Sequence, residues 1–288
     1  MKLIRDPKKL SEVLTKLRRQ GKSVGFVPTM GALHAGHLSL VRASNRENDI
    51  TVVSIFVNPT QFGPQEDLAK YPRPLQRDLN LLRVAKADLV LAPSVGSMYP
   101  EDLGKPLKIQ GAKWPRLAKG LCGKFRPGHF QGVVTVVAKL LDIVCPSRLY
   151  LGAKDYQQAS VLKQLVLDLG LGVKVRVMPT VREKDGLAMS SRNRYLSADD
   201  RRRALGLSRA LLALKRGLSK RKGPLTVLRA QALRELKKSS DRVQYLGVVD
   251  PSTLRVLKHS QKSMVALAAC FAGKTRLIDN VTIHRSHQ

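Results

Sequence analysis

The sequence predicts an α/β fold in which a doubly wound parallel sheet is followed by a smaller C-terminal α+β domain. Three observations support this prediction. Short apolar, β-branched runs alternate with segments of helical period over residues 1–178. The helical segments are long enough to cross over between parallel neighbours of one sheet. After Pro179 the alternation stops, and helical segments precede a series of strands.

The elements of the first part follow from this alternation in chain order. Its strands are predicted from runs of four to seven residues that are rich in Val, Ile and Leu. These strands are residues 24–27, 51–57, 88–92, 148–151 and 173–178. The predicted helices between most of them are residues 37–48, 74–87, 131–144 and 155–169.

The second part of the chain has a different order of elements. Two basic helical regions come first, at residues 197–222 and 225–238, and a charged, Gly-containing stretch at 215–222 is expected to be a mobile connection. The predicted strands that follow are residues 243–249, 263–271 and 276–282. This order predicts an α+β domain, with the boundary near Met178.

The chain is strongly basic, with 52 Lys and Arg against 21 Asp and Glu and a formal net charge of +31. Such an excess attracts polyanions, so a basic nucleic-acid-binding protein is one alternative. The basic residues are spread along the chain, however, and an aromatic content of 5% leaves few rings for stacking on bases. Incidental polyanion binding is therefore favoured over nucleic-acid binding as the main role.

The cysteine pattern and the distribution of apolar residues indicate in which cellular compartment the protein is expected. Cys122, Cys145 and Cys270 are widely separated and match no zinc or disulfide framework. Residues 1–19 lack the continuous apolar stretch of a signal peptide. No stretch approaches the roughly 20 apolar residues that a membrane span requires. These features predict a soluble, cytoplasmic protein with no membrane partner.

The most informative motif lies where the predicted strand at 24–27 ends. There a turn with Gly31 leads to an HxGH sequence, and a helix begins. A helix N-terminus offers unpaired N–H groups and partial positive charge to a phosphate, and the glycines permit close approach. His34 and His37 are three residues apart and are expected to project to one side of the first helical turn, where they can stabilise charge that develops on a phosphate.

An HxxH pair has two other interpretations. Without context it is more often a pair of surface histidines. A zinc site is disfavoured because no Cys or third His lies at a ligand-like spacing. The preceding strand and the two glycines favour nucleotide binding instead.

Several motifs resemble those of one family. The string PTMGALHAGH, at residues 28–37, resembles the pantothenate synthetase version of the HxGH signature of the nucleotidyltransferase superfamily. Other matching strings follow in the order of that family: FVNPTQF at 56–62, RPGHFQGV at 126–133, GAKDYQQ at 152–158 and MSSRN at 189–193. YPR at 71–73, VDP at 249–251 and TRLIDN at 275–280 extend the resemblance to nearly the whole chain.

The resemblance implies both an architecture and a reaction. It implies a Rossmann-like domain over residues 1–178 that binds nucleotide and pantoate, and an α+β lid domain over residues 179–288. The implied enzyme joins pantoate to β-alanine through a pantoyl adenylate and releases pyrophosphate and AMP. ATP, as a substrate, and Mg²⁺ are the implied cofactors. A homodimer formed through the N-terminal domain is also implied.

The resemblance further implies roles for individual residues. The expected catalytic residues are His34, His37, Lys154 and Arg192. The expected ATP-binding residues are Met30, Gly31, Ala32, Leu33, His34, Ala35, Gly36, His37, Gly152, Ala153, Lys154, Asp155, Val181, Met189, Ser190, Ser191 and Arg192. The expected pantoate and β-alanine ligands are Asn58, Gln61 and Gln158, and Asp78 is the expected magnesium ligand.

The chemistry of these residues agrees with the implied roles but leaves other interpretations open. The neutral amides of Gln61 and Gln158 can hold a hydroxy acid without quenching its carboxylate, although each also suits a loop cap or a solvated helix. Asp155 also suits a helix cap, and a Ser-Ser-Arg string is common in solvated turns. An ordinary Pro-Gly loop suits His129, whereas Arg126 suits either that loop or an anchor for an anionic group.

Two departures from the family pattern and one rival enzyme remain. Ala153 stands where many relatives carry a polar or acidic residue, and Gln76 and Arg77 replace acidic residues of some relatives, which weakens the magnesium assignment. The rival is a nucleotidyltransferase that moves AMP or CMP onto a phosphate-bearing substrate. Such an enzyme would lack the paired glutamines and the Ser-Ser-Arg segment.

Overall fold

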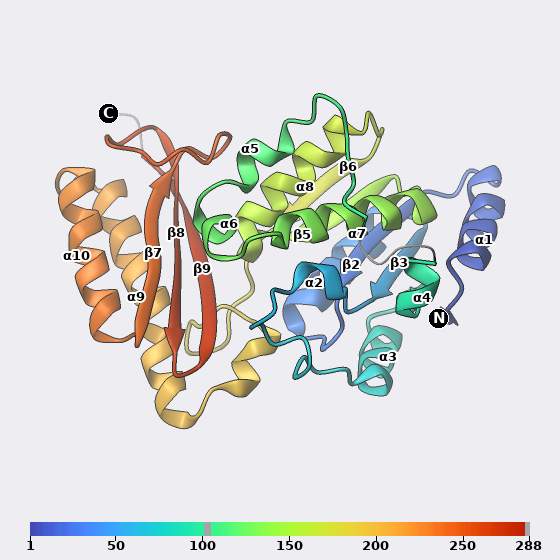
Figure 1. The fold of residues 1–288 in the computed structure, drawn as a ribbon, viewed down its shortest axis with the longest axis horizontal. Helices are drawn as coiled ribbons and strands as arrows, with labels where there is room; N and C mark the ends of the chain where they lie inside the picture. Colours follow the sequence, from blue (N-terminus) through green and yellow to red (C-terminus); the bar gives the residue numbers. More distant parts are fainter. Residues whose placement is uncertain (101–104, 286–288) are drawn as a thin grey trace. The chain divides into compact units, whose positions relative to one another are not determined.

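The computed structural model describes residues 1–100 and 105–285, and its chain forms two compact units (Figure 1). The first unit comprises residues 1–119, 126–152 and 158–179. The second comprises residues 120–125, 153–157 and 180–288. Two short segments that the sequence-based boundary assigned to the N-terminal domain, 120–125 and 153–157, thus cluster with the second unit.

In its described residues, the first unit contains a six-stranded sheet with the order β1-β4-β3-β2-β5-β6. All of the pairings are parallel. The strands are β1 (Lys2–Ile4), β2 (Val24–Thr29), β3 (Ile50–Ile55), β4 (Leu89–Leu91), β5 (Arg148–Gly152) and β6 (Lys174–Met178). The chain runs from β2 to β3 on one side of the centre and from β5 to β6 on the other, which is the doubly wound arrangement expected from the sequence.

Helices connect these strands. They are α1 (Pro7–Arg19), α2 (Ala35–Glu47), α3 (Leu75–Val84), α4 (Val95–Met98), α5 (Trp114–Ala118), α7 (His129–Val144) and α8 (Tyr156–Asp168), with a 3₁₀ turn, η1 (Pro59–Gln61). The sequence-based prediction missed β1 and α1. The signal for α1 was present, because Asp6 caps the backbone N–H of Lys8 and Pro7 occupies the first turn.

The core of the first unit follows the strand periodicity. Val27, Val53 and Val90 occupy equivalent positions on neighbouring strands and pack with Leu40 of α2 and Leu82 of α3. Residues at the alternate positions of the same strands are also buried. A sheet that is buried on both faces explains the continuous apolar runs in the sequence.

In the described part of the second unit, a three-stranded antiparallel sheet has the order β7-β8-β9. Its strands are β7 (Arg242–Val249), β8 (Ser263–Ala272) and β9 (Thr275–His284). The helices α9 (Ala198–Ser219) and α10 (Leu225–Lys238) cover one face of this sheet, as Figure 1 shows. Shorter elements are α6 (Leu121–Phe125) and the 3₁₀ turns η2 (Ala153–Asp155) and η3 (Ser191–Tyr195).

The α/β class and the α+β character of the C-terminal region are confirmed. The predicted helix at 225–238 matches α10 at both ends. No helix within residues 1–100 and 105–285 is both long and apolar enough to span a membrane.

Candidate active site

The HxGH segment leaves the carboxyl end of β2 through a tight turn. Gly31 has φ +79°, and Ala32 also has a positive φ, of +51°. Thr29 stabilises the start of the turn, since its Oγ1 accepts from the N–H of Gly31 and donates to the carbonyl of Ser54 on β3. The positive φ favours glycine at this position, and a Cβ on Gly31 would lie 3.0 Å from Asp78 Oδ2, which is a tight contact.

The two histidines of the motif lie at the N-terminus of α2. His34 is the N-cap residue, and its Nδ1 accepts from the N–H of Gly36 at 3.2 Å. Because a backbone N–H can only donate, the proton of a neutral His34 ring lies on Nε2. The His34 and His37 rings have centroids 4.0 Å apart and an interplanar angle of 32°. The three-residue spacing of His34 and His37 therefore brings two imidazoles together at the positive end of a helix dipole.

Asp78 holds the turn that precedes these histidines. Its Oδ2 accepts from the N–H of Ala32 at 2.8 Å and its Oδ1 from the N–H of Leu33 at 2.9 Å, and Asp78 is only 1% exposed. A buried carboxylate that already accepts two backbone N–H groups is poorly suited to bind a hydrated Mg²⁺. The structure thus supports a positioning role for Asp78 in place of the metal-ligand role expected from the sequence.

Asn58 and Gln61 flank η1, just beyond the carboxyl end of β3. Asn58 Nδ2 donates to Gln61 Oε1 at 3.2 Å, and Gln61 Nε2 contacts Met30 Sδ at 3.0 Å. Asn58 is itself held by Tyr99, whose hydroxyl donates to Asn58 Oδ1 at 2.8 Å. The structure therefore brings together three of the predicted ligand residues, Met30, Asn58 and Gln61. Burial raises the pKa of Tyr99, which keeps its hydroxyl a donor.

The approach of α7 to η1 requires a glycine. Asn58 Nδ2 also donates to the carbonyl of Gly132, in the first turns of α7. A Cβ on Gly132 would lie 2.3 Å from the carbonyl oxygen of Thr60 and 2.7 Å from the N of Gln61. Only glycine fits this contact between two backbones.

Arg126 and His129 form a network with Glu66 and Gln61. Arg126 donates from Nε to Glu66 Oε1 at 2.7 Å and from Nη2 to Glu66 Oε2 at 2.5 Å. Arg126 Nη1 contacts His129 Nε2 at 2.9 Å, and His129 Nδ1 contacts the carbonyl of Gln61 at 2.8 Å. Burial acts to raise the pKa of Glu66, but the hydrogen bond and charge of Arg126 outweigh it and the pKa is lowered. The expected Pro-Gly turn is present, with Gly128 at φ +77° and the N–H of His129 donating to the carbonyl of Arg126, and both side chains also take part in this network.

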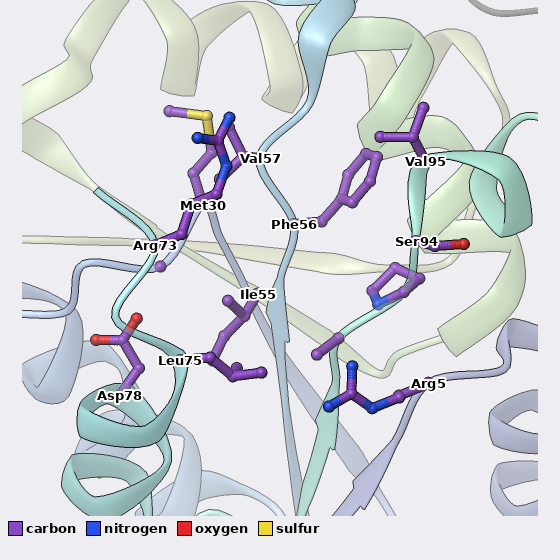
Figure 2. Close-up of a pocket in the computed structure, with 13 residues that line it drawn as sticks. Arg5, Met30, Ile55, Phe56, Val57, Arg73, Leu75, Asp78, Ser94 and Val95 are labelled. Atoms are coloured by element: carbon purple, nitrogen blue, oxygen red, sulfur yellow. The ribbon is translucent and has the colours of Figure 1, made fainter. Parts of the chain in front are cut away.

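A cavity of about 280 Å³ lies beyond the carboxyl ends of strands β1 to β4 (Figure 2). Figure 2 shows Arg5, which follows β1, and Arg73 on opposite sides of this cavity, with Phe56 between them. The lining includes Met30 and Asp78 but, among the described residues, neither histidine of the motif nor Gln61. The cavity thus lies beside the HxGH turn.

In the second unit, Asn280 holds the η2 segment in place. Its Nδ2 donates to the carbonyls of Ala153 and Lys154, at 2.8 and 2.7 Å. Lys154 Nζ lies 3.6 Å from Asp155 Oδ2. The neighbouring Asp279 is 3% exposed and accepts two hydrogen bonds from Arg182, at 2.7 and 3.0 Å.

The remaining ATP-binding candidates of this unit lie on one hairpin and the turn after it. The N–H of Met189 donates to the carbonyl of Val181. Ser190 then caps η3, with its Oγ accepting from the N–H of Arg192, and Ser191 is buried. The hairpin also carries Arg182, so the Arg182–Asp279 pair links it to the strand that holds η2. These candidates therefore lie on one continuous, hydrogen-bonded segment of the second unit.

Two predicted residues lie at the start of the β5–α8 connection. Gly152 ends β5 and has open space where a Cβ would stand. Gln158 is half-buried in the first turn of α8. Both belong to the first unit, whereas Lys154 and Asp155 between them belong to the second.

Sequence reasoning missed the residues that support the site. Glu66 and Tyr99 lie outside the motifs that drew attention, and Asn280 lay inside one without an assigned role. A signal existed for Asn280, because an amide beside an acidic residue within an apolar strand must find hydrogen-bond partners when it is buried. No local signal marked Glu66, whose partner Arg126 lies 60 residues away.

Comparison with known proteins places these features in a family. The model for pantoate-beta-alanine ligase matches residues 2–282. The chain is 47% identical to the pantothenate synthetase of Sulfurihydrogenibium sp. (strain YO3AOP1), over 98% of this chain and 99% of that protein. The crystal structure of pantothenate synthetase from Thermus thermophilus matches with a TM-score of 0.90 and 44% identity, over 98% and 99% of the two chains.

A further solved structure was determined with ligands. Pantoate-beta-alanine ligase from Francisella tularensis, complexed with beta-gamma ATP and beta-alanine, matches with a TM-score of 0.80 and 37% identity, covering 98% of this chain and 97% of that one. The agreement thus extends over nearly the full length in both sequence and fold. The chain therefore belongs to the pantoate-beta-alanine ligase family.

Proposed function

We propose that the protein catalyses the ATP-dependent condensation of (R)-pantoate with β-alanine to give pantothenate, AMP and pyrophosphate. One observation carries this proposal. Two imidazoles pack together at the N-terminus of α2, beyond the carboxyl end of central strand β2, in a chain that matches the family over residues 2–282. Ligands of open α/β sheets bind at this end of the strands, and a helix N-terminus attracts phosphate.

The first half-reaction forms a pantoyl adenylate. A carboxylate oxygen of pantoate attacks the α-phosphorus of ATP in line, and the bond from that phosphorus to the pyrophosphate oxygen breaks. The Nε2–H of His34 and the ring of His37 are assigned to the phosphates, where they stabilise the negative charge on the leaving group. His37 is the proposed proton donor to pyrophosphate. No covalent enzyme intermediate is needed, because positioning and charge neutralisation lower the barrier.

The second half-reaction forms the amide. The β-alanine amine attacks the acyl carbon of the adenylate, the acyl–oxygen bond breaks and AMP leaves. Gln61 and Gln158, with Asn58 beside Gln61, are assigned to pantoate and the β-alanine that joins it. Neutral amides can hold the hydroxyl and carboxylate of pantoate while leaving that carboxylate nucleophilic.

The second unit supplies further assignments for ATP. Lys154 and Arg192 are assigned as cationic phosphate ligands, and Ser190 and Ser191 as hydroxyl donors. Asp155 is assigned to the ribose hydroxyls. The backbone around Gly152, Ala153, Val181 and Met189 is assigned to the nucleotide. The hydrogen bonds from Asn280 to the carbonyls of η2 support these assignments, because they fix the backbone from which Lys154 projects.

Magnesium enters this proposal as part of the substrate Mg·ATP. Within the described residues there is no group of three or more His, Cys, Asp or Glu side chains able to hold a metal ion. Asp78, the candidate from the sequence, is engaged by two backbone N–H groups. The donor set therefore does not fit a resident Mg²⁺ site, and ATP phosphates and water are the proposed ligands.

Three further proposals concern the setting of the enzyme. We propose a homodimer, to be tested by sedimentation, and a cytoplasmic location, to be tested by fractionation. Polyanion binding is assigned to residues 209–238, which carry ten Lys and Arg and a single acidic residue, Glu235. The positive charge of this helical hairpin predicts nucleic-acid binding that weakens steeply as the salt concentration rises and that does not change when pantoate is added.

The proposed reaction is tested in two stages. Pyrophosphate release is measured with Mg·ATP and pantoate, and then AMP and pantothenate are measured after β-alanine is added. The substitutions His34→Ala and His37→Ala are each expected to lower the rate of the first stage about 100-fold, since each removes a preorganised donor. His259→Ala, at an exposed histidine, is the matched control. An unchanged rate of pyrophosphate release in both active-site variants would remove the central assignment.

A further inference from the structure

We propose that His129, fixed in a single tautomer by Arg126 and Glu66, is a positioning residue that sets the location of Gln61 for pantoate. This inference rests on the proposed function of Gln61. His129 is the first residue of α7 and is 7% exposed. It reaches Gln61 through the backbone carbonyl, and so it acts on the substrate through another residue.

The tautomer follows from the hydrogen-bonding capacity of the two neighbours. A guanidinium has only donors, so Arg126 Nη1 must donate to His129 Nε2 across 2.9 Å. A carbonyl has only an acceptor, so His129 Nδ1 must donate to Gln61 O across 2.8 Å. Both bonds form together only when the ring is neutral and carries its proton on Nδ1. An imidazolium would place an N–H against the N–H of Arg126.

Glu66 keeps the guanidinium in the orientation that this tautomer requires. The two bonds from Arg126 Nε and Nη2 to the carboxylate are parallel, which fixes the plane of the guanidinium and aims Nη1 at the imidazole. The side chains of Arg126 and Glu66 are 13% and 24% exposed, so the pair is largely shielded from water. Because Glu66 already neutralises its charge, Arg126 is poorly placed to act as the anchor for an anionic substrate.

Gln61 is consequently fixed at both of its ends. Its carbonyl is held by His129, while its side-chain amide lies between Asn58 Nδ2 and Met30 Sδ. The close approach of Gly132 restrains the peptide between Thr60 and Gln61, whereas the Gln61 carbonyl belongs to the following peptide. Loss of the His129 bond leaves this carbonyl with only a 3.5 Å contact from Arg126 Nη2, so the peptide after Gln61 can shift and displace the amide that is assigned to pantoate.

The decisive experiment compares two amides at position 129. In His129→Asn, the side-chain nitrogen occupies the place of Nδ1 and can still donate to the Gln61 carbonyl. In His129→Gln, the amide occupies the place of Nε2, so it can accept from Arg126 but leaves the Gln61 carbonyl with only the 3.5 Å contact from Arg126 Nη2. We expect the KM for pantoate to rise about tenfold in His129→Gln and to stay within about 1.5-fold of the wild type in His129→Asn.

The remaining readouts separate positioning from loss of fold. Partial unfolding lowers the fraction of active enzyme and therefore kcat, whereas positioning changes the KM for pantoate and leaves the KM for ATP unchanged. His259→Gln is the matched control for the histidine-to-amide change. Equal values of the pantoate KM in His129→Asn and His129→Gln would overturn the proposal.

A second variant addresses the outcome in which neither change at position 129 gives folded protein. Glu66→Gln keeps the shape of a partly exposed side chain but removes the charge that orients Arg126. It is expected to raise the pantoate KM about threefold, and an unchanged KM would count against the network. Gln61→Ala tests the underlying function separately. If Gln61→Ala leaves the pantoate KM unaltered, the assignment of Gln61 itself fails; if it raises the KM but His129→Gln does not, only the role of His129 fails.

Discussion

Replacing Asp78 by Asn separates the two roles that this residue can have. The change keeps the size of the side chain but removes its charge and one of its two acceptor oxygens. One of the N–H groups of Ala32 and Leu33 then faces an amide nitrogen instead of an oxygen. Because Asp78 is 1% exposed, water cannot replace the lost acceptor.

The size of the effect follows from these contacts. A hydrogen bond from a backbone N–H to a charged group contributes about 1.5–3 kcal/mol, and a buried donor left without an acceptor costs a further 1–3 kcal/mol or so. If the lost hydrogen bond and the unpaired donor together cost about 3 kcal/mol, the unfolding temperature should fall by roughly 6 to 12 °C for a unit of this size. The positive φ of Ala32 adds to the loss, since Asp78 holds that strained backbone in place.

The assay is thermal unfolding together with pyrophosphate release as Mg²⁺ is varied. A positioning role predicts a lower unfolding temperature and a slower first half-reaction, with the same dependence on Mg²⁺ as the wild type. Asp142→Asn, at an exposed carboxylate on α7, is the matched control. If Asp78→Asn kept the wild-type unfolding temperature and regained full activity at high Mg²⁺, the positioning argument would be refuted and the metal-ligand role restored.

Three further perturbations test other contacts. Gly132→Ala places a Cβ 2.3 Å from the carbonyl oxygen of Thr60, so stability should fall by about 3 kcal/mol in chemical denaturation, and the pantoate KM should rise; a wild-type midpoint and KM would contradict the packing argument. Arg182→Ala leaves the carboxylate of Asp279 buried without its counter-charge and should cost about 3–5 kcal/mol, whereas a loss below about 1 kcal/mol would show that the pair is dispensable. A serine hydroxyl and nearby backbone N–H groups lower the pKa of Asp250 from 3.8 to about 2. The stabilisation by the ionised Asp250 is therefore present above about pH 4 and lost as the pH falls towards 2. Asp250→Asn should be less stable than the wild type at about pH 6, and the difference in unfolding free energy should narrow between about pH 4 and pH 2. A difference that does not change with pH would exclude this linkage.

Local patterns were sufficient for most of the fold. The apolar runs at β2, β3 and β5 and the helical period of α10 predicted elements that the structure contains, because burial on one or both faces imposes those periods. The edge strand β1, with only three residues, gave too short a pattern to recognise. The assignment of residues 120–125 and 153–157 to the second unit was also beyond local reasoning, since it depends on contacts with residues more than 100 positions away.

The sequence by itself determined the fold class, the family resemblance and the HxGH pair, because each depends on residue types at fixed short spacings. The tertiary structure alone decided what surrounds those residues. In the fold, Asp78 accepts from the backbone of the HxGH turn, Arg126 pairs with Glu66 and His129 contacts the carbonyl of Gln61. These are hydrogen bonds between segments 46 to 68 residues apart, and their partners are chosen by how strands and helices pack rather than by any local pattern. The sequence thus specified which groups can carry the chemistry, and packing specified which of them are held in place and by what.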